Sequence, residues 1–191
     1  SMASFSLGDQ YLTSLFQSIT LRTAGFNTIG IGGLHRTTYL VMMLFMFIGA
    51  ASGSTAGGIK INTVAVIGAR IRSSLRNQEQ TILAGNRINE ALIQKAFLIL
   101  VFGISLVGLG TIILSATESM PLVELMFESV SAFGTVGLST GVTSSLSPAG
   151  KIVIIFLMFL GRLGPLTVLA AFGRPAKIRN VTYPQAQISL G

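Results

Sequence analysis

The apolar residues of this chain fall into long runs, not into the alternation of a strand or the narrow stripe of an amphipathic helix. Residues 96–116 contain no charged side chain over 21 positions, which is enough for a helix to cross about 30 Å of hydrocarbon. Residues 152–172 form a second run of this kind, interrupted by Arg162 and by the glycine and proline residues beside it. These two runs predict helices that lie in lipid.

Two further apolar stretches do not make simple membrane spans. Residues 39–51 predict a helix that breaks in the glycine- and serine-rich segment 49–58 and resumes over residues 59–69. Residues 122–133 predict a helix too short to cross a membrane, and it contains two glutamates. Non-helical backbone at membrane depth has to line a cavity or be buried in protein, because lipid offers it no hydrogen bonds. The pattern therefore favours an all-α integral membrane protein with a pore or a binding cavity.

Composition and charge support a lipid environment. Half of the residues are hydrophobic and 10% are charged, whereas a soluble domain carries about 25% charged residues. Much of the net charge of +7 comes from basic clusters in residues 70–95 and 174–179, which flank apolar runs as expected of cytoplasmic segments. Nucleic-acid binding is disfavoured, because no basic stripe interleaves with exposed aromatic residues. The absence of cysteine excludes a thiolate nucleophile and a cysteine-ligated metal.

The polar segments divide the chain into four parts. We expect residues 1–69 to contain a short helix, a loop and the broken helix, and residues 70–95 to form a cytoplasmic loop with a short helix at 88–95. Residues 96–173 are expected to form a complete unit of helix, short helix, loop and helix, and residues 174–191 a cytoplasmic tail. This orientation places the acidic segment around residue 124 on the outer side.

An internal repeat relates the two halves of the chain. A shift of 112 residues places Thr23–Gly25 on Thr135–Gly137, and Met46–Gly49 on Met158–Gly161. A shift of 111 residues aligns a third pair of segments, Phe16-Gln17-Ser18-Ile19 and Phe127-Glu128-Ser129-Val130. Three segments that align at nearly one offset indicate a duplication. Each unit thus contains a short helix, a loop and a long helix, and only the second unit has a full span before it.

The loop in each unit is a candidate selectivity filter of the kind found in potassium channels, which present rings of backbone carbonyls to a dehydrated ion. Gly25 and Gly137, the third residues of the two loop sequences, permit the backbone angles that turn a carbonyl toward the pore. The threonines add hydroxyl ligands, and each preceding short helix points its negative C-terminal end at the cation. Two ordinary glycine turns are the alternative. The candidate filter residues are Thr23, Ala24, Gly25 and Phe26 in the first loop, and Thr135, Val136, Gly137 and Leu138 in the second.

Arg162 and the glycine- and serine-rich segment form a candidate gate. A charged residue within a span is costly and indicates a function. By the repeat, Arg162 corresponds to Ala50, so its guanidinium is expected near the carbonyls that the helix break frees. A snorkelling or purely structural arginine is the alternative. The candidate gate residues are Gly49, Ser52, Gly53, Ser54, Thr55, Gly57, Gly58 and Arg162.

Four segments together resemble the Trk/Ktr/HKT family of bacterial potassium transporters, and specifically its KtrB-type subunits. Residues 16–28 resemble the family's third filter region and residues 49–60 its gating loop. Residues 131–139 resemble the fourth filter, and residues 159–165 the last helix with its pore-facing arginine. The family implies four such repeats around one pore. This sequence matches only the third, without its first helix, and the fourth.

The resemblance implies a function and partners that the residues alone do not give. It implies potassium uptake, often dependent on sodium, across a bacterial plasma membrane that the chain crosses several times. Potassium, and in some members sodium, would bind at the filter, without an organic cofactor on this chain and without enzymatic activity. The implied partners are the remaining repeats of the same subunit, a second subunit in a homodimer, membrane lipids, and a KtrA-like nucleotide-binding ring docked on residues 70–95 and the tail.

The sequence leaves three other functions open. One is a self-contained channel with two loops per chain, assembled by dimerisation. A second is a secondary transporter that binds its substrate at the helix break near residues 49–58. The third is an intramembrane protease with Ser52 or Ser54 as nucleophile, which needs a base within hydrogen-bond reach. His35 is predicted on the outer side, and Lys60 is the other candidate base. Glu128 either attracts cations in an outer vestibule or binds a neighbouring backbone amide.

Overall fold

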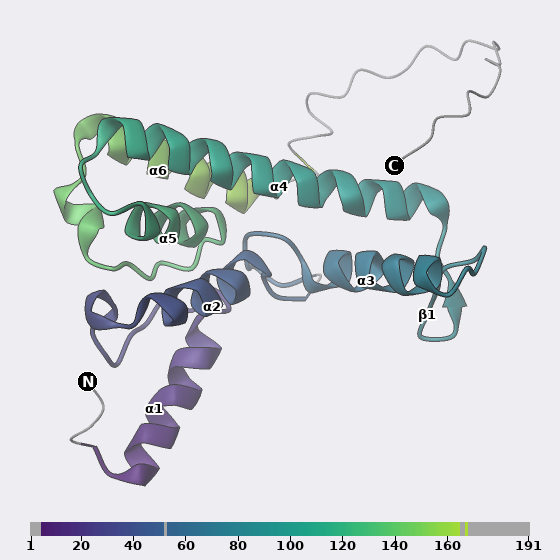
Figure 1. Ribbon diagram of the computed structural model, residues 1–191, viewed down its shortest axis with the longest axis horizontal. Coiled ribbons are helices and arrows are strands. Elements are labelled where there is room, and N and C mark those ends of the chain that lie inside the picture. Colours follow the sequence, from purple (N-terminus) through teal and green to yellow (C-terminus); the bar gives the residue numbers. More distant parts are fainter. Residues whose placement is uncertain (1–4, 52, 165–166, 168–191) are drawn as a thin grey trace.

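The computed structural model describes residues 5–51, 53–164 and 167, and these form a mostly helical structure (Figure 1). The helices are α1 (Leu7–Thr20), α2 (Arg36–Phe47), α3 (Ile61–Leu75), α4 (Glu90–Thr117), α5 (Leu122–Phe133) and α6 (Pro148–Leu163). Two 3-10 turns, η2 (Ile31–Gly33) and η3 (Val142–Ser145), and a hairpin of β1 (Ile82–Leu83) and β2 (Asn86–Arg87) complete the described elements.

The short helix α5 lies at the centre of the packing. It contacts α2, α4 and α6, whereas α3 packs on the other part of α4. Phe127 and Phe133 of α5 are fully buried. Tyr39 meets the ring of Phe127 edge-on at 5.4 Å, and Phe47 lies 5.7 Å from Phe133. A helix buried around most of its circumference is held firmly, so α5 fixes the position of the loop that follows it. The predicted helix over residues 122–133 is confirmed at both ends.

The predicted break between residues 49 and 58 is confirmed. Helix α2 ends at Phe47 and α3 begins at Ile61. Between them the chain returns to its own starting point, because the backbone N of Gly49 donates to the oxygen of Ile59 at 2.8 Å and the N of Ile59 donates to Phe47 at 3.2 Å. Ile48 and Ile59 thereby form an isolated parallel bridge. The second half of the broken helix starts two residues later than predicted.

The separate short helix expected over residues 88–95 is wrong. Helix α4 begins at Glu90, where the Asn89 side chain accepts a hydrogen bond from the N of Ala91 at 3.0 Å, and it continues to Thr117. The sequence offers no glycine or proline between residues 90 and 102 to stop it. Upstream, α3 runs to Leu75, and the hairpin joins the two helices. The predicted loop is therefore mostly regular structure.

Among the described residues, α4 is the one helix long and apolar enough to cross a membrane. Helix α6 runs beside it (Figure 1). It begins four residues before the predicted run, because Ser147 caps the N of Gly150 at 3.1 Å and Pro148 suits the first turn. It ends at Leu163, and most of the predicted run beyond it lies outside the described residues together with the basic tail. Large apolar side chains such as Ile112, Ile155 and Phe159 are exposed on these helices.

Candidate functional site

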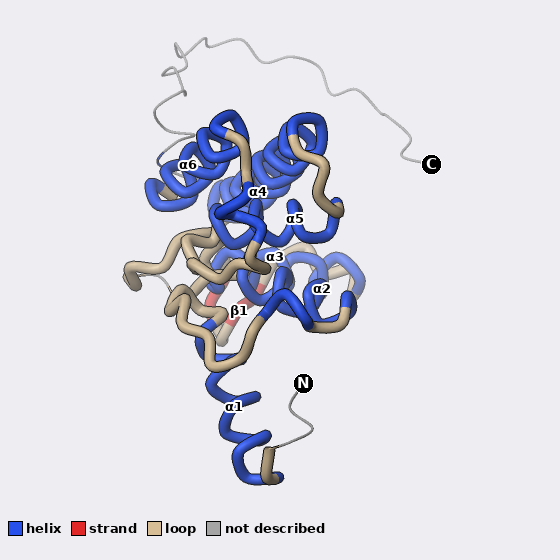
Figure 2. The backbone as a smooth tube through the Cα atoms, turned by 90° about the vertical axis from the view of Figure 1, so that its left-hand side faces the viewer, coloured by secondary structure: helices blue, strands red, loops and turns tan. Residues whose placement is uncertain are grey.

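The loops that follow α1 and α5 lie face to face between α1 and the layer of α4 and α6 (Figure 2). We call residues 21–27 the first loop and residues 134–140 the second loop. A Cβ atom built on Gly25 would collide with the carbonyl oxygen of Val136. One built on Gly137 would lie 3.7 Å from the Cα of Gly25. The two central glycines of the candidate filter sequences are therefore neighbours in space.

Both loops are anchored to the preceding helix in the same way. The Thr20 hydroxyl donates to the oxygen of Phe26 at 2.6 Å, and the Ser131 hydroxyl donates to the oxygen of Leu138 at 2.6 Å. In addition, the N of residue 24 donates to residue 20 at 3.2 Å, and the N of residue 136 donates to residue 131 at 2.9 Å. These pairs are related by the same shifts of 111 and 112 residues that the sequence predicts between helix and loop.

The backbone angles of the loops also correspond. Thr23 has φ 69° and Thr135 has φ 50°, which is uncommon for a β-branched residue. Gly25 and Gly137 follow with φ 76° and 89°. Such angles cost free energy and persist only where the surroundings impose them, which is typical of functional sites. The two loops therefore present the same unusual backbone shape.

The side chains of the second loop face the core. Val136 and Leu138 are buried with Phe127 and Phe133, and the carbonyl of Val136 faces Gly25. The carbonyls of Phe26 and Leu138 accept bonds from the helix behind them, so these two residues anchor their loops. All eight candidate filter residues thus lie in one region.

Residues 49–58, which we call the Gly/Ser loop, carry carbonyls bound by two cationic side chains. Lys60 Nζ donates to the oxygens of Ser54, at 3.2 Å, and of Ala56. The guanidinium of Arg162 donates to the oxygen of Thr55. Three consecutive carbonyls therefore accept hydrogen bonds from two cationic side chains, one just after the loop and one on α6. The structure brings Arg162 to the broken helix as the repeat predicts, whereas Ser52 lies outside the described residues.

The Gly/Ser loop also touches the second loop. The backbone N of Gly57 donates to Thr135 Oγ1 at 3.1 Å. A Cβ on Gly58 would lie 3.4 Å from the Cα of Gly134. The candidate gate residues at the end of the loop are thus packed against the start of one candidate filter sequence, although 78 residues separate Gly57 from Thr135.

Glu128 accepts hydrogen bonds from its own chain, including one from a backbone amide, as the second of its two predicted roles expects. Its carboxylate is 4% exposed. It accepts bonds from Ser139 Oγ at 2.8 Å, from the N and Oγ1 of Thr140 at 2.9 and 3.0 Å, and from Thr143 Oγ1. The corresponding residue of α1, Gln17, is 8% exposed and has no hydrogen-bond partner for its amide among the described residues. The three hydroxyl residues Ser139, Thr140 and Thr143, close together after the short helix, are the feature of the sequence that indicates this acceptor role.

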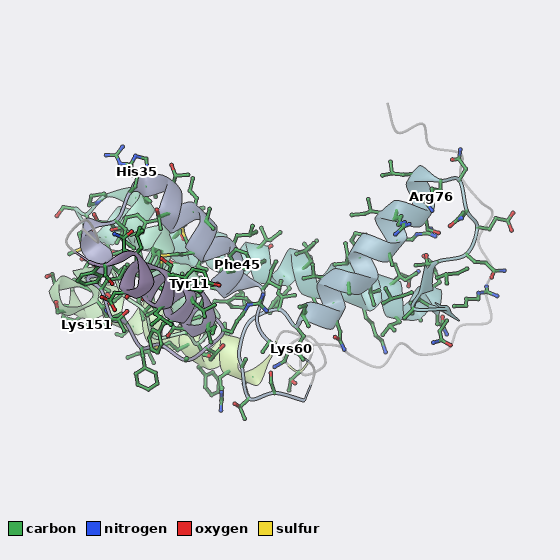
Figure 3. All side chains as sticks on the ribbon, turned by 90° about the horizontal axis from the view of Figure 1, so that it is seen from below. Tyr11, His35, Phe45, Lys60, Arg76 and Lys151 are labelled. Carbon is green, nitrogen blue, oxygen red and sulfur yellow. The ribbon has the colours of Figure 1, made fainter. Side chains whose placement is uncertain are left out.

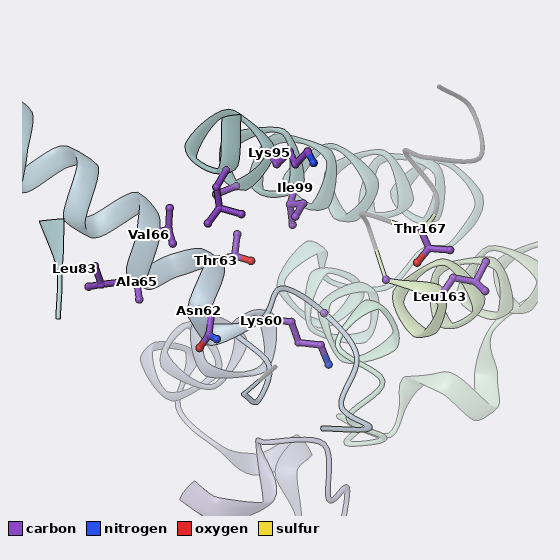
Figure 4. Close-up of a pocket in the computed structure, with 14 residues that line it drawn as sticks. Lys60, Asn62, Thr63, Ala65, Val66, Leu83, Lys95, Ile99, Leu163 and Thr167 are labelled. Carbon is purple, nitrogen blue, oxygen red and sulfur yellow. The ribbon is translucent and has the colours of Figure 1, made fainter. Parts of the chain in front are cut away.

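A cavity of about 690 Å³ lies beside the Gly/Ser loop (Figure 4). Its walls come from the start of α3, from α4 and from the end of α6, and its polar lining includes Lys60, Asn62, Thr63 and Lys95. Apolar side chains such as Val66 and Ile99 make up the larger part of the lining. The Gly/Ser loop therefore borders a mostly apolar cavity that contains a few polar groups.

The described residues do not support the protease interpretation. His35 caps α2 by accepting a bond from the N of Thr37 at 3.3 Å, and Lys60 is bound to loop carbonyls. Figure 3 places His35 and Lys60 in different parts of the molecule. The described residues also contain no group of three or more acidic or histidine side chains that could hold a metal ion.

The chain is similar in sequence to several potassium uptake proteins. The chain is 41% identical to the Ktr system potassium uptake protein B of Bacillus subtilis over 183 residues, which cover 96% of this chain and 41% of that protein. It is 36% identical to the Ktr system potassium uptake protein B of Vibrio alginolyticus, covering 100% and 42%. It is 34% identical to the potassium/sodium uptake protein NtpJ of Enterococcus hirae, covering 96% and 42%. The chain therefore spans about two fifths of these relatives.

The fold agrees with this grouping. The crystal structure of the potassium transporter TrkH from Vibrio parahaemolyticus superposes with a TM-score of 0.77 at 21% identity, covering 90% of this chain and 39% of that one. Residues 1–178 match the family TrkH, described as cation transport protein. The homologues are ion transport proteins and not enzymes. With a family match over nearly its whole length, this chain belongs to the TrkH family of cation transport proteins.

Proposed function

We propose that this chain forms part of the pore of a membrane protein that takes up potassium. Its first and second loops would supply two walls of the selectivity filter, and the Gly/Ser loop would close the pore beneath them. The observation that carries the proposal is the shared geometry of the two loops. They have the same φ signature and the same anchoring bonds, and their glycines are in contact. The choice of potassium as the transported ion rests on the relatives that are named potassium uptake proteins.

Two loops cannot surround an ion. A potassium filter is built from four loops whose carbonyls replace the hydration shell. The two loops of this chain contact each other at Gly25 and Val136, as neighbouring walls of a ring would. Since the chain spans about two fifths of its relatives, we propose that further repeats of the same subunit supply the other two walls. The repeats would have arisen by duplication of a unit with a short helix, a loop and a long helix.

The gate would work by position and by charge. Arg162 and Lys60 hold three consecutive carbonyls of the Gly/Ser loop, which keeps the loop against the second loop at Thr135. Two positive charges directly below a cation filter also oppose the passage of a cation. Opening would require the loop to leave Thr135 and both cations to release its carbonyls. The cavity beside Lys60 gives the loop a space into which it can move.

The remaining expectations follow the relatives. We propose a multi-pass protein of a bacterial plasma membrane that works as a homodimer and is regulated by a KtrA-like nucleotide-binding ring. The polar region between α3 and α4, with Arg70, Arg72 and Arg76, would lie on the cytoplasmic side and receive that ring. Sodium would act in transport, in line with the relative named as a potassium/sodium uptake protein. The filter loops would be the ion-binding sites, with no organic cofactor on this chain.

Rubidium uptake tests the proposal. The whole gene product that carries this chain is expressed in a bacterial strain that lacks its own potassium uptake systems, and growth at low potassium is scored beside the flux. We expect uptake above the empty-vector level and its loss in Gly137→Ala, because φ 89° is unfavourable for alanine. A secondary transporter that binds at the helix break would tolerate this change. Uptake equal to the vector in every strain, with the protein present in the membrane, would end the proposal.

A further inference from the structure

The side chain of Thr135 joins the second loop to the Gly/Ser loop. Its Oγ1 accepts a hydrogen bond from the backbone N of Gly57 at 3.1 Å. A Cβ on Gly57 would lie 2.5 Å from Oγ1 and 2.7 Å from Cγ2 of Thr135. Only glycine fits at this approach, and Gly57 and Gly58 are both buried. The contact is therefore a closely packed junction, in which the hydrogen bond is partly buried.

The backbone of the second loop holds the hydroxyl in this place. Thr135 has φ 50°, and its own N donates to the oxygen of Ala132 at 3.0 Å. A β-branched side chain has few rotamers to choose from. The hydroxyl therefore meets Gly57 without a further conformational change in the second loop.

The two filter threonines differ in this respect. Thr23 in the first loop has the same kind of backbone. Its hydroxyl, however, donates to the oxygen of Gly134 at 3.4 Å and so bonds to the neighbouring loop. Thr23 and Thr135 thus form a natural comparison: both carry a hydroxyl at the start of a candidate filter sequence, and Thr135 bonds to the Gly/Ser loop.

We propose that a potassium ion at the inner end of the filter and the closed Gly/Ser loop compete for the hydroxyl of Thr135, so that potassium promotes opening of its own gate. The inference rests on the proposed function. A hydroxyl oxygen has two acceptor lone pairs. The N–H of Gly57 uses one of them and points its positive hydrogen at the oxygen that the ion would bind. An ion on this oxygen and the N–H therefore repel each other.

Thermodynamic linkage between potassium binding and loop closure sets the size of the expected effect. If the closed loop weakens potassium binding by some factor, potassium weakens loop closure by the same factor. One ordinary hydrogen bond corresponds to a change of about 2- to 10-fold in such an equilibrium. We therefore expect potassium to lower the ratio of closed to open loops by about this factor.

Spin-label distances measure the position of the Gly/Ser loop directly. The chain has no cysteine, so Ser54→Cys and Lys151→Cys label the loop and the start of α6 after any cysteine elsewhere in the gene product is replaced. Distance distributions are recorded on the whole protein in lipid nanodiscs, with potassium and with an impermeant organic cation. We expect potassium to deplete the closed distance in the labelled parent and in Thr135→Ser. In Thr135→Val the closed population should be smaller at the outset and unchanged by potassium.

Thr23→Val is the matched control, because it removes the same hydroxyl from the loop that does not hold Gly57. It should keep the response of the closed population to potassium. The inference is overturned if Thr135→Val responds like the parent, or if Thr23→Val loses the response to the same extent. The second result would mean that the hydroxyls act only through ion binding. Rubidium uptake by the unlabelled protein tests the proposed function separately: if the unlabelled protein takes up no rubidium, the proposed function fails and this inference falls with it.

Discussion

The guanidinium of Arg162 donates a hydrogen bond to the carbonyl oxygen of Thr55, which lies 107 residues earlier in the chain. The arginine comes from the last turn of α6, and the carbonyl comes from backbone that the break between α2 and α3 leaves unpaired within its own helix. A bond between a charged donor and an accessible backbone acceptor can be made and broken without cost to the helices that carry it. Arg162 is therefore suited to hold the Gly/Ser loop in one of two positions.

The first prediction concerns this bond. Replacing Arg162 by alanine should raise rubidium uptake, because the closed loop loses a charge-assisted hydrogen bond worth about 1 kcal/mol at an exposed site, roughly a fivefold shift toward the open state. Arg162→Lys keeps the positive charge and a hydrogen-bond donor group, and it should retain more than half of the closure. Flux through the whole gene product at saturating rubidium is the measurement. An unchanged flux in Arg162→Ala would exclude a latch at this residue.

The second prediction concerns the contact between the central glycines of the two loops, Gly25 and Gly137. Gly25→Ala places a methyl group against the carbonyl of Val136 at a backbone angle that alanine disfavours, so it should abolish uptake while protein levels remain. Gly30→Ala is the matched control, because a Cβ there meets nothing within 4 Å. Potassium-dependent growth and membrane abundance are compared in both strains. Equal uptake in the two variants would contradict the face-to-face arrangement of the loops.

The third prediction concerns the carboxylate of Glu128. Its removal in Glu128→Ala leaves four donors, three at the end of the second loop and one just after it, without their acceptor, which costs about 1–3 kcal/mol. We expect a lower melting temperature in detergent and a reduced preference of uptake for rubidium over sodium. Glu128→Gln keeps one carbonyl oxygen, so its melting temperature and ion preference should lie between those of the parent and of Glu128→Ala. Glu124→Ala, on the same helix, is the control. A lower melting temperature without any change in ion preference would restrict Glu128 to folding.

The fourth prediction concerns the packing of α4 on α6. A Cβ on Gly110 would lie 2.6 Å from Leu157 Cδ1, whereas a Cβ on Gly108 meets nothing within 4 Å. Gly110→Ala should therefore destabilise the protein by about 1–3 kcal/mol through overpacking, and Gly108→Ala should be neutral or stabilising through its helix propensity. Thermal unfolding in detergent compares the two. The double variant Gly110→Ala/Leu157→Ala should lose less stability than the sum of the losses of the two single variants, and a simple sum would place the strain elsewhere.

Much of the helical architecture could be predicted from the sequence. Apolar runs predicted α4 and α5, and the glycine- and serine-rich segment predicted the break after α2. Hydrophobic length and glycine content are local properties, so they can be read along the chain. The starts of α4 and α6 were missed because caps at Asn89 and Ser147 extend these helices beyond the apolar residues.

The contacts of the site depended on tertiary structure. The repeat predicted that the loops would share a shape and that Arg162 would lie near the helix break, because equal segments occupy corresponding places. It could not predict that Gly57 bonds to Thr135, since no sequence period relates these two residues. It also could not decide between the two roles of Glu128, because hydroxyl donors eleven to fifteen residues away reach the carboxylate only through the turn after the second loop.

The bridge between Ile48 and Ile59 has a consequence for how this protein can vary. It closes the neck of the Gly/Ser loop, so the spacing of α2 and α3 is set at the neck and not by the ten residues beyond it. The cost of closing a loop grows only slowly with its length. The exposed tip of the Gly/Ser loop, around Gly53 and Ser54, can therefore change in length or composition without moving either helix, while the close-packed glycines at the two ends of the loop stay fixed.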